Sequence, residues 1–397
     1  MKGRGAVRRL RAIAGTAGSG AAGGAGTDPA SPALVELAQR GPAPLAPAPP
    51  DPGAPLSVAA LIPSFRRGSG GHATIVHILR ELRDRGHSIS LWLEDTEARH
   101  AREGGTVTRR SFQQFFAADG LELQSDLGGW KGADVVLATG WQTVARALLL
   151  PGAGARAYLV QDHEPDFYGA SAERIWAQES YRQGLHCIAA SRWLAELLRE
   201  RYGASATHFD LAADHSVYRA RDQPRVDDLV VFYARAVTPR RAVPLGLLAL
   251  AELAQRRPGL EFALFGEDRS LQVGFEHRHL GVLEGRQLAE LYSRATVGMV
   301  LSLTNPSLVA LEMMACGLPC VELQSESMLA TFGDGGPLEL AALDPLALCA
   351  ATERLLEDRE RRETASREGI ELVAERTWAR AASQVEDGLR AALARLQ

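Results

Sequence analysis

Two successive runs of alternating strand and helix patterns constrain the fold of this chain most strongly. The first run begins at Ser57, where the short apolar stretch SVAALIP predicts a buried strand. The segment GGHATIVHILRELRDRGH then has apolar residues at helical spacing, and SISLWLED returns to a strand pattern. A strand, a helix and a strand in succession form a βαβ unit, so the sequence predicts a parallel sheet.

The alternation is interrupted once. Strand patterns continue through ADVVLATG, ARAYLVQD and HCIAAS, a polar stretch with proline occupies 219–228, and the pattern resumes with LVVFYAR, EFALFGE, VGMVLSL and LPCVELQ. The 397 residues are enough for two cores of this kind. The sequence therefore predicts two doubly wound, Rossmann-like α/β domains, 57–220 and 221–375, followed by a C-terminal helix, 376–397, that crosses back to the first domain.

The N-terminal segment has a different composition. Residues 1–56 are rich in glycine, alanine and proline, so they predict a disordered tail with room for one short helix near 33–40. The basic start of the tail could touch an anionic membrane surface, although a solvated tail is the simpler interpretation.

Composition excludes some classes of protein. A net charge of −4 argues against a nucleic-acid partner. The four cysteines are Cys187, Cys316, Cys320 and Cys349. They lie in apolar runs without metal-binding spacing, which indicates reduced core thiols of a cytoplasmic protein. No apolar stretch reaches the ~18–20 residues of a membrane span. We therefore expect a cytoplasmic protein, with peripheral contact at the inner face of the plasma membrane if its acceptor is lipid-linked.

Ligands of such sheets bind beyond the carboxyl ends of the strands, so the loops there are the candidate sites. In PSFRRGSGGHA, Gly68, Gly70 and Gly71 precede a helix and allow the backbone to approach a phosphate or sugar. Residues 63–67 lengthen the turn beyond a dinucleotide-binding fingerprint. The alternative is a flexible loop without a ligand.

Two further loops carry ionisable groups. In QDHEPDFY, Asp162, His163 and Glu164 follow a strand and suit acid, base or acceptor-hydroxyl roles. The alternative is that the two carboxylates only cap the backbone or pair with Arg174. In YARAVTPRR, the guanidinium groups of Arg235 and Arg240 could clamp a pyrophosphate. The alternative is that both arginines are simply solvated.

The fourth candidate is the apolar helix in NPSLVALEMMACGLP. Asn305 can cap this helix and Pro306 suits its first turn, so the positive helix end would point at the strand ends. Glu312 lies about two turns in, between Leu308 and Met314, where an unpaired carboxylate would be costly. A ligand with hydroxyl donors would satisfy it, and so would a backbone amide or an arginine.

Together these motifs resemble glycosyltransferase family 4, the retaining sugar transferases of the GT-B fold, over residues 57–380. The resemblance is carried by LEMMACGLP, the Gly70-Gly71 loop, IAASRWLAELL, AADHSVYR with Asp214, the arginine pair, and LFGE with Gly266. The stretches VQDHEPDFY, YARAVTPRR and SLTNPSLVALEMMACGLP are similar to bacterial rhamnosyltransferases that build O-antigen or S-layer glycans.

The resemblance implies a role for each candidate residue. Glu312 would accept hydrogen bonds from the nucleotide's ribose or deoxyribose, and Arg235 and Arg240 would hold the diphosphate. The remaining donor-binding positions would be Gly70, Gly71, Gly266, Thr304, Asn305, Ser307 and Leu308, and the acceptor would face Asp162, His163 and Glu164. The chain departs from the family where Thr304 replaces a glutamate that usually touches the donor sugar. A 6-deoxy donor such as dTDP-L-rhamnose is therefore an expectation, with a glycan or lipid-linked oligosaccharide as acceptor.

The sequence contains no D-x-D pair, so we expect metal-independent transfer, with the nucleotide sugar as co-substrate and no further cofactor. A pyridoxal-phosphate phosphorylase of similar shape is excluded because the second domain has no lysine. Three alternatives stay open: an NAD-dependent oxidoreductase that uses Gly68, Gly70, Gly71 and Asp95, a sugar-nucleotide epimerase, and a binding or scaffold subunit that lost activity at Thr304.

Overall fold

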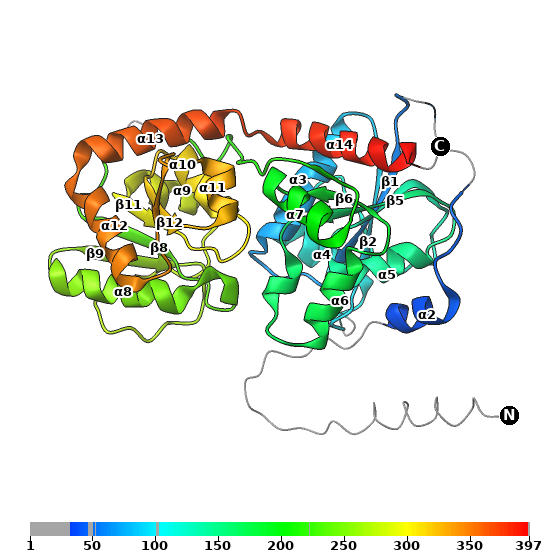
Figure 1. The fold of residues 1–397 in the computed structure, drawn as a ribbon, viewed down its shortest axis with the longest axis horizontal. Helices are drawn as coiled ribbons and strands as arrows, with labels where there is room; N and C mark the ends of the chain where they lie inside the picture. The colour runs from blue at the N-terminus through cyan, green and yellow to red at the C-terminus, as the bar shows by residue number, and fades with distance from the viewer. Residues whose placement is uncertain (1–31, 47–50, 52, 101–102, 222, 396–397) are drawn as a thin grey trace, which may run out of the picture.

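Two α/β domains lie side by side in the computed structural model, which describes residues 32–46, 51, 53–100, 103–221 and 223–395 (Figure 1). Over these residues the N-terminal sheet has seven parallel strands in the order β3-β2-β1-β4-β5-β6-β7. They are β1 (Ser57–Pro63), β2 (Ser88–Glu94), β3 (Leu123–Gln124), β4 (Ala133–Ala138), β5 (Ala153–Val160), β6 (His186–Ala189) and β7 (Ala206–His208).

The C-terminal sheet repeats this plan. Over the described residues it has six parallel strands in the order β10-β9-β8-β11-β12-β13. They are β8 (Leu229–Tyr233), β9 (Glu261–Phe265), β10 (Arg278–His279), β11 (Val297–Met299), β12 (Cys320–Leu323) and β13 (Leu338–Ala341). The predicted fold class, two doubly wound parallel sheets, is confirmed.

Helices cover the two sheets and explain the strand composition. The N-terminal domain has α3 (Gly70–Asp84), α4 (Gly105–Phe116), α5 (Trp141–Leu149), the 3₁₀ turn η1 (Glu164–Phe167), α6 (Ala172–Ser180) and α7 (Arg192–Tyr202). The C-terminal domain has the 3₁₀ turn η2 (Pro239–Arg241), α8 (Val243–Arg256), α9 (Gly285–Arg294), α10 (Leu308–Ala315), α11 (Glu326–Phe332), α12 (Pro345–Glu357) and α13 (Arg359–Ala374). Because both faces of a parallel sheet are covered, strands such as β1, β6 and β12 are buried along almost their whole length and are mostly apolar.

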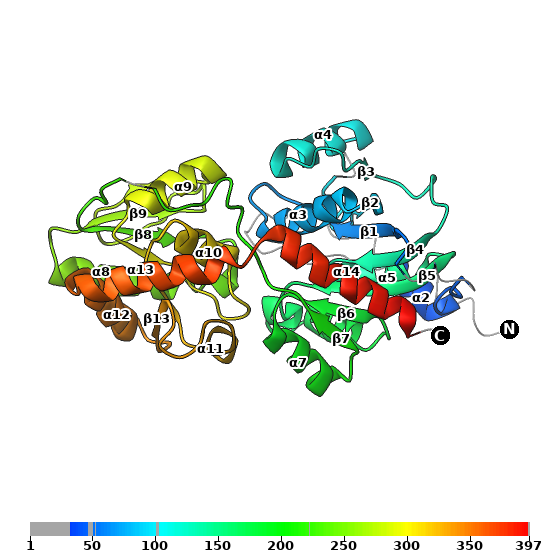
Figure 2. The same cartoon turned by 90° about the horizontal axis from the view of Figure 1, so that it is seen from above.

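The last helix, α14 (Trp378–Ala394), lies across the N-terminal domain, while α13 lies on the C-terminal one (Figure 2). The indole of Trp378 stacks on the imidazole of His77 in α3 with ring centroids 4.6 Å apart. Glu386 accepts a hydrogen bond of 2.9 Å from Arg85. The chain therefore passes between the domains twice, once after β7 and once before α14.

Part of the predicted tail is docked on the N-terminal domain. The helix anticipated near 33–40 is present as α2 (Pro32–Arg40) and packs against α5. The backbone of Ala43 donates to the carbonyl of Leu148, and that of Ala46 donates to the carbonyl of Ala153. The short helix expected in the tail is therefore present, and the chain as far as residue 46 is hydrogen-bonded to the domain. Residues 1–31, 47–50 and 52 of the predicted tail lie outside the described part of the chain.

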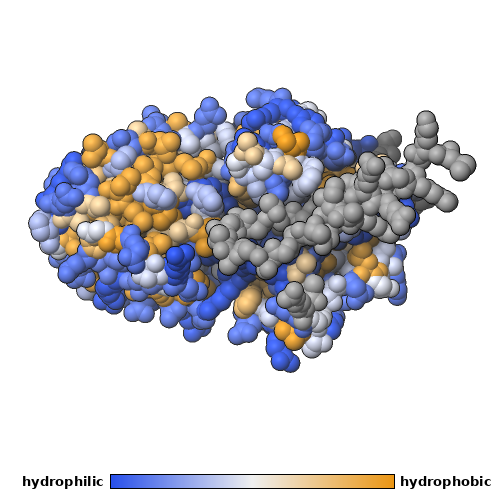
Figure 3. Space-filling model, turned by 90° about the horizontal axis from the view of Figure 1, so that it is seen from below, coloured by the Kyte–Doolittle hydropathy of each residue, from blue (hydrophilic) through white to orange (hydrophobic). Residues whose placement is uncertain are grey.

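Other surface and core features are simple to place. All four cysteines are free and buried. Among the described residues, no helix combines the length and the apolarity that crossing a membrane would take. Figure 3 shows apolar side chains gathered on one face of the C-terminal domain. Exposed leucines of the neighbouring helices α8 and α12 and of the turn before α12 are Leu248, Leu346 and Leu343.

Candidate functional site

The candidate loops leave the two sheets at equivalent points. In the N-terminal sheet the strand order reverses between β1 and β4, and in the C-terminal sheet it reverses between β8 and β11. The glycine loop follows β1, Arg235 follows β8, and Thr304 and Asn305 follow β11. Crevices at such reversals are where ligands of doubly wound sheets bind.

Glycines bring the two domains close at this junction. A Cβ at Gly68 would lie 3.2 Å from Nη1 of Arg235, and a Cβ at Gly70 would lie 3.7 Å from Cδ1 of Leu308. Gly68 has a φ of +73°, which an L side chain would strain. Gly70 and Gly71 are the first two residues of α3, so the start of this helix faces the start of α10.

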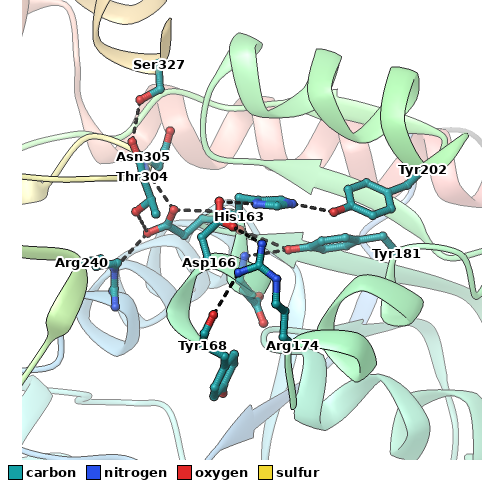
Figure 4. A network of polar contacts seen from close by, with 12 residues as sticks. His163, Asp166, Tyr168, Arg174, Tyr181, Tyr202, Arg240, Thr304, Asn305 and Ser327 are labelled. Carbon is teal, nitrogen blue, oxygen red and sulfur yellow. Dashed lines mark hydrogen bonds and ion pairs between the residues drawn. The ribbon is translucent and has the colours of Figure 1, made fainter. Parts of the chain in front are cut away.

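Asp162 joins the domains through three groups of the C-terminal domain, which belong to Thr304, Asn305 and Arg240. Figure 4 shows these three residues beside the loop of His163. Oδ2 of Asp162 accepts a hydrogen bond of 2.9 Å from the hydroxyl of Thr304 and lies 3.2 Å from Nε of Arg240. Its Oδ1 accepts from the backbone amides of Asn305, at 3.0 Å, and His163, at 2.9 Å. Asp162 therefore binds the second domain. Both of its carboxylate oxygens have protein partners, so neither is left free to act as an acid or base on a substrate.

Thr304, at the position where the resemblance to glycosyltransferase family 4 leads us to expect a glutamate, is part of this contact. Thr304 is 5% exposed, and its hydroxyl points at Asp162. A carboxylate at position 304 would face the carboxylate of Asp162, and like charges at this distance repel. A threonine at position 304 thus fits the domain-joining role of Asp162.

Asn305 also spans the junction, but it does not cap α10. Its amide nitrogen donates to the carbonyls of Gln161, at 3.1 Å, and Ala190, at 2.9 Å, and its Oδ1 accepts from the hydroxyl of Ser191. The helix begins at Leu308, and Ser307 caps it by accepting from Val309. The predicted cap was wrong because the amide of Asn305 finds both donor and acceptor partners in the other domain.

Arg240 is held on the same side of the junction. Its guanidinium pairs with Asp162 and lies 4.0 Å from the centre of the Phe167 ring, while its side chain is 26% exposed. Burial lowers the pKa of Arg240, and the charge of Asp162 opposes that shift. Arg235 lies elsewhere: its Nη1 donates to the carbonyl of Gly266 at 3.4 Å, beside Gly68. The two arginines therefore flank the junction with different partners.

The other acidic-loop residues point into the N-terminal domain. The ring of His163 is 1% exposed and contacts Asp166 at 2.6 Å and the Tyr202 hydroxyl at 2.7 Å. Glu164 is 6% exposed, and its oxygens accept from the Trp141 amide and the Tyr158 hydroxyl, both at 2.7 Å. The structure does not turn His163 or Glu164 toward an acceptor.

Burial raises the pKa of Glu164 to about 7, although hydrogen bonds from Trp141 and Tyr158 oppose that shift. Arg174 bonds Asp166 and the carbonyl of Tyr168. The alternative in which Arg174 pairs with Asp162 or Glu164 is therefore wrong.

Glu312 lies in the second turn of α10 and is half-buried. Burial raises its pKa to about 7, a hydrogen bond from the Tyr218 hydroxyl lowers it, and the charge of Asp214 raises it. Neither an arginine nor a backbone amide is its partner among these contacts, contrary to the alternative considered for this residue. The aromatic residues Tyr292 and Phe265 continue from this carboxylate toward Gly266.

Sequence reasoning missed several partners at the junction. Tyr218 was visible in AADHSVYR, but nothing in the sequence paired it with Glu312. Phe167 and Ser191 follow strand ends that were predicted, yet their partners lie in the other domain. A cavity of about 560 Å³ opens at the opposite, amino ends of the C-terminal strands. Its half-buried Arg225 already bonds the carbonyls of Ala295 and Gly317, so we do not assign the site there.

Comparison with known proteins agrees with this arrangement. The protein-family model described as "WsaF, N-terminal domain" matches residues 129–192, and the family model described as "WsaF, C-terminal domain" matches residues 228–334. The O-antigen biosynthesis protein RfbC of Myxococcus xanthus is 33% identical over 207 residues, which are 51% of this chain and 16% of that protein. This chain thus spans about a sixth of the length of that relative.

Solved structures show the same fold. Sucrose-phosphate synthase from Thermosynechococcus elongatus superposes with a TM-score of 0.64 at 18% identity, over 85% of this chain and all of that one. Anabaena Alr3699/HepE in complex with UDP-glucose gives 0.63 at 14% identity, over 86% of this chain and all of that one. The two domains therefore adopt the GT-B fold of glycosyltransferase structures.

Proposed function

We propose that this chain is a glycosyltransferase that moves a sugar from a nucleoside-diphosphate donor to a surface-glycan or glycolipid acceptor. The observation that carries the proposal is the meeting of the Gly68–Gly71 loop, Arg235, Arg240 and the start of α10 at the reversal points of two facing sheets. Glu312 adds a half-buried acceptor for the hydroxyl groups of the nucleotide.

The chemical step accounts for the charges. When the bond between the anomeric carbon and the diphosphate oxygen breaks, negative charge develops on the leaving phosphate. Arg235, Arg240 and the first amides of α10 would stabilise this charge, and one preorganised donor of this kind contributes roughly 2.7–4 kcal/mol. Arg240 would share its guanidinium between Asp162 and the diphosphate. With these cations and amides in place, transfer would need no metal. The resemblance to glycosyltransferase family 4 adds retention of the anomeric configuration to the proposal.

The names of the relatives support the glycan class. RfbC is named for O-antigen biosynthesis, and HepE was solved with UDP-glucose. We further propose that the donor carries a 6-deoxy sugar and, most specifically, that it is dTDP-L-rhamnose. The reasons are the motifs that resemble rhamnosyltransferases and the threonine at position 304. Such an enzyme would work in the cytoplasm, at the inner membrane face when its acceptor is lipid-linked.

A donor panel tests the proposal. Purified protein is incubated with dTDP-L-rhamnose, UDP-glucose or GDP-mannose and a glycan acceptor, with and without EDTA, and the released nucleoside diphosphate is measured. We expect release with one donor, undiminished by EDTA. Nucleotide binding without release would support the scaffold alternative, and absence of nucleotide binding would end the proposal.

Arg240 is the sharpest single position in this mechanism. Arg240→Ala should lower turnover about a hundredfold, since it removes a cation that faces the leaving phosphate. Arg256→Ala is the matched control, because this arginine lies at the far end of α8 and pairs with Glu252 and Glu353. Equal turnover in both variants would remove Arg240 from the mechanism.

A further inference from the structure

Asn305 is the single asparagine of the 397-residue sequence, and it is buried where the two domains meet, with 1% of its surface exposed. Its amide nitrogen donates to the carbonyls of Gln161 and Ala190, the residues that directly follow β5 and β6. These strands are neighbours, and their pairing ends at Val160 and Ala189. Asn305 therefore supplies donors to the first carbonyls beyond the paired strands, which burial would otherwise leave without a partner.

The acceptor atom of the same amide is occupied as well. Oδ1 of Asn305 accepts a hydrogen bond of 3.1 Å from the hydroxyl of Ser191, whose oxygen caps α7 by accepting from the amide of Leu194. Asparagine is the shortest side chain that offers two N–H donors and one carbonyl acceptor. An aspartate of the same size has no donor when ionised, and a serine or threonine has only one. The junction therefore has a specific chemical requirement for this residue.

The loop that carries Asn305 is braced from its own domain (Figure 4). The hydroxyl of Ser302 donates to the carbonyl of Asn305 at 2.8 Å, and the hydroxyl of Ser327 in α11 donates to the carbonyl of Thr304 at 2.6 Å. The amide of Ser302 donates in turn to the carboxylate of Glu322 at 2.8 Å. Helix α11 itself packs against α7 of the N-terminal domain. Because the loop is fixed, moving one domain away from the other would break the bonds of Asn305.

We propose that Asn305 is a positioning residue for sugar transfer, whose buried side chain fixes the domain arrangement in which the first residues of α3 and α10 face each other. The inference rests on the proposed function, because it gives this arrangement the task of holding a donor between the domains. The side chain does not touch the donor, because its polar groups are bonded to the N-terminal domain. It acts through the close approach of Gly70 and Leu308.

Other contacts across the junction are more easily exchanged. Nη2 of Arg67 and Oε1 of Glu284 are 3.5 Å apart, and these side chains are 55% and 77% exposed, so the pair contributes little. The guanidinium of Arg240, which pairs with Asp162, is also the group that would turn to the leaving diphosphate. The side-chain bonds of Asn305 are uncharged and shielded from solvent, so donor binding leaves them intact.

The first test measures the domain arrangement without any substrate. Spin labels are attached to cysteines introduced by Ile175→Cys in α6 and Val237→Cys before η2, two exposed positions on opposite sides of the junction. The four native cysteines are buried and do not take the label. Pulsed electron paramagnetic resonance should give a narrow distance distribution when position 305 is unchanged. Asn305→Asp replaces the amide donor with an oxygen that faces two carbonyls, so the distribution should broaden and its maximum should move to a longer distance.

Two further variants control for loss of stability. Asn305→Ala loses the same bonds without adding a charge, so it should shift the distance in the same direction and decides the question if Asn305→Asp does not fold. Asp134→Ala is the matched control: it removes the acceptor of the amide and the hydroxyl of Ser57, at 2.6 Å and 2.7 Å, at the amino ends of β1 and β4. It should lower the melting temperature without changing the distance distribution.

Turnover and nucleotide binding separate positioning from a structural role. With the donor that the wild type accepts, Asn305→Ala should lower turnover about a hundredfold, since misplacing a bound group by about 1 Å can cost that much. Its affinity for UDP or dTDP should stay close to the wild-type value, because Arg235, Glu312 and the first amides of α10 all belong to the C-terminal domain. Asp134→Ala should keep both values.

The outcomes distinguish the two proposals. If the wild type transfers no sugar from any donor, the proposed function fails and the inference fails with it. If the wild type transfers sugar but Asn305→Ala keeps the wild-type distance distribution or the wild-type turnover, the inference alone is overturned. An equal shift in Asp134→Ala would also overturn it, because loss of hydrogen bonds far from the junction would then have the same effect.

Discussion

The two domains each bury a glutamate near the junction, and burial raises the pKa of both Glu164 and Glu312 to about 7. Their surroundings differ. Glu164 is almost fully buried, and both of its oxygens are occupied by donors of its own domain, Trp141 and Tyr158. Glu312 is half-buried, and a single hydroxyl, that of Tyr218, opposes the rise of its pKa. A shifted pKa is common to structural and functional carboxylates, so the remaining capacity to accept hydrogen bonds is what marks Glu312 as the binding candidate.

The largest effect that tests this comparison is on stability. Glu164→Ala leaves the Trp141 amide and the Tyr158 hydroxyl without their acceptor, at a cost of about 2–4 kcal/mol in the free energy of unfolding. Urea denaturation measures it. If Glu164→Ala instead kept its stability and lost transfer activity, Glu164 would regain the catalytic role first assigned to it and the contrast with Glu312 would collapse.

A smaller effect should appear in binding at Glu312. Glu312→Gln keeps the shape of the side chain but loses the charge that accepts hydroxyl groups, so nucleoside-diphosphate affinity should fall about tenfold. The free energy of unfolding should change by less than about 1 kcal/mol, since the side chain is half-buried and the amide keeps one oxygen acceptor. Calorimetric titration and urea denaturation of the same sample give both numbers. Loss of stability without loss of affinity would place Glu312 with Glu164.

A third glutamate gives the smallest effect and sharpens the comparison. Glu322 is fully buried; its Oε1 accepts from the amides of Ser302 and Leu323, and its Oε2 has no hydrogen-bond partner within the described residues. Burial raises its pKa to about 8. Its stabilising contribution is therefore complete below the unfolded pKa of about 4.5 and is lost as the pH rises through about 8.

Glu164 and Glu312 act in the same direction, so the melting temperature should fall between pH 5 and pH 9. In Glu322→Gln, whose amide stays neutral, the fall should be smaller by about 2–4 °C. Glu386, whose pKa neighbouring cations lower to about 2, loses its contribution only below about 4.5 and does not interfere. A melting curve of Glu322→Gln parallel to that of the wild type would show that this carboxylate does not titrate in the window.

The sequence predicted those parts of the fold that depend on local pattern. β1 was predictable because a strand buried on both faces is a nearly continuous apolar run, and β12 because its apolar residues are interrupted by Glu322 alone. The edge strands β3 and β10 have two residues each, too few to show a period, and they were missed. The start of α10 was displaced by two residues because Asn305 and Ser307 are both good caps, and the side chain of Asn305 bonds Ser191 of the other domain instead.

The candidate site was predictable as a set of loops but not as a set of partners. Parallel sheets place the residues after β1, β5, β8 and β11 at one edge, which brought Gly70, Asp162, Arg235 and Asn305 into a single prediction. The bond between Asp162 and Thr304 joins residues 142 positions apart, and its formation depends on how one domain sits against the other. No local pattern contains that information, so Asp162 was assigned to chemistry rather than to holding the domains.

The return of α14 to the first domain restricts how the molecule can move. Because the chain passes between the domains after β7 and again before Trp378, the two crossings define an axis, and rotation about it is the motion that leaves both connections unstretched. Opening for substrate exchange should then be a hinge rotation about this axis, without free rotation of one domain about a single connection. Cutting the chain before Trp378 would leave a single tether and add twisting to that movement.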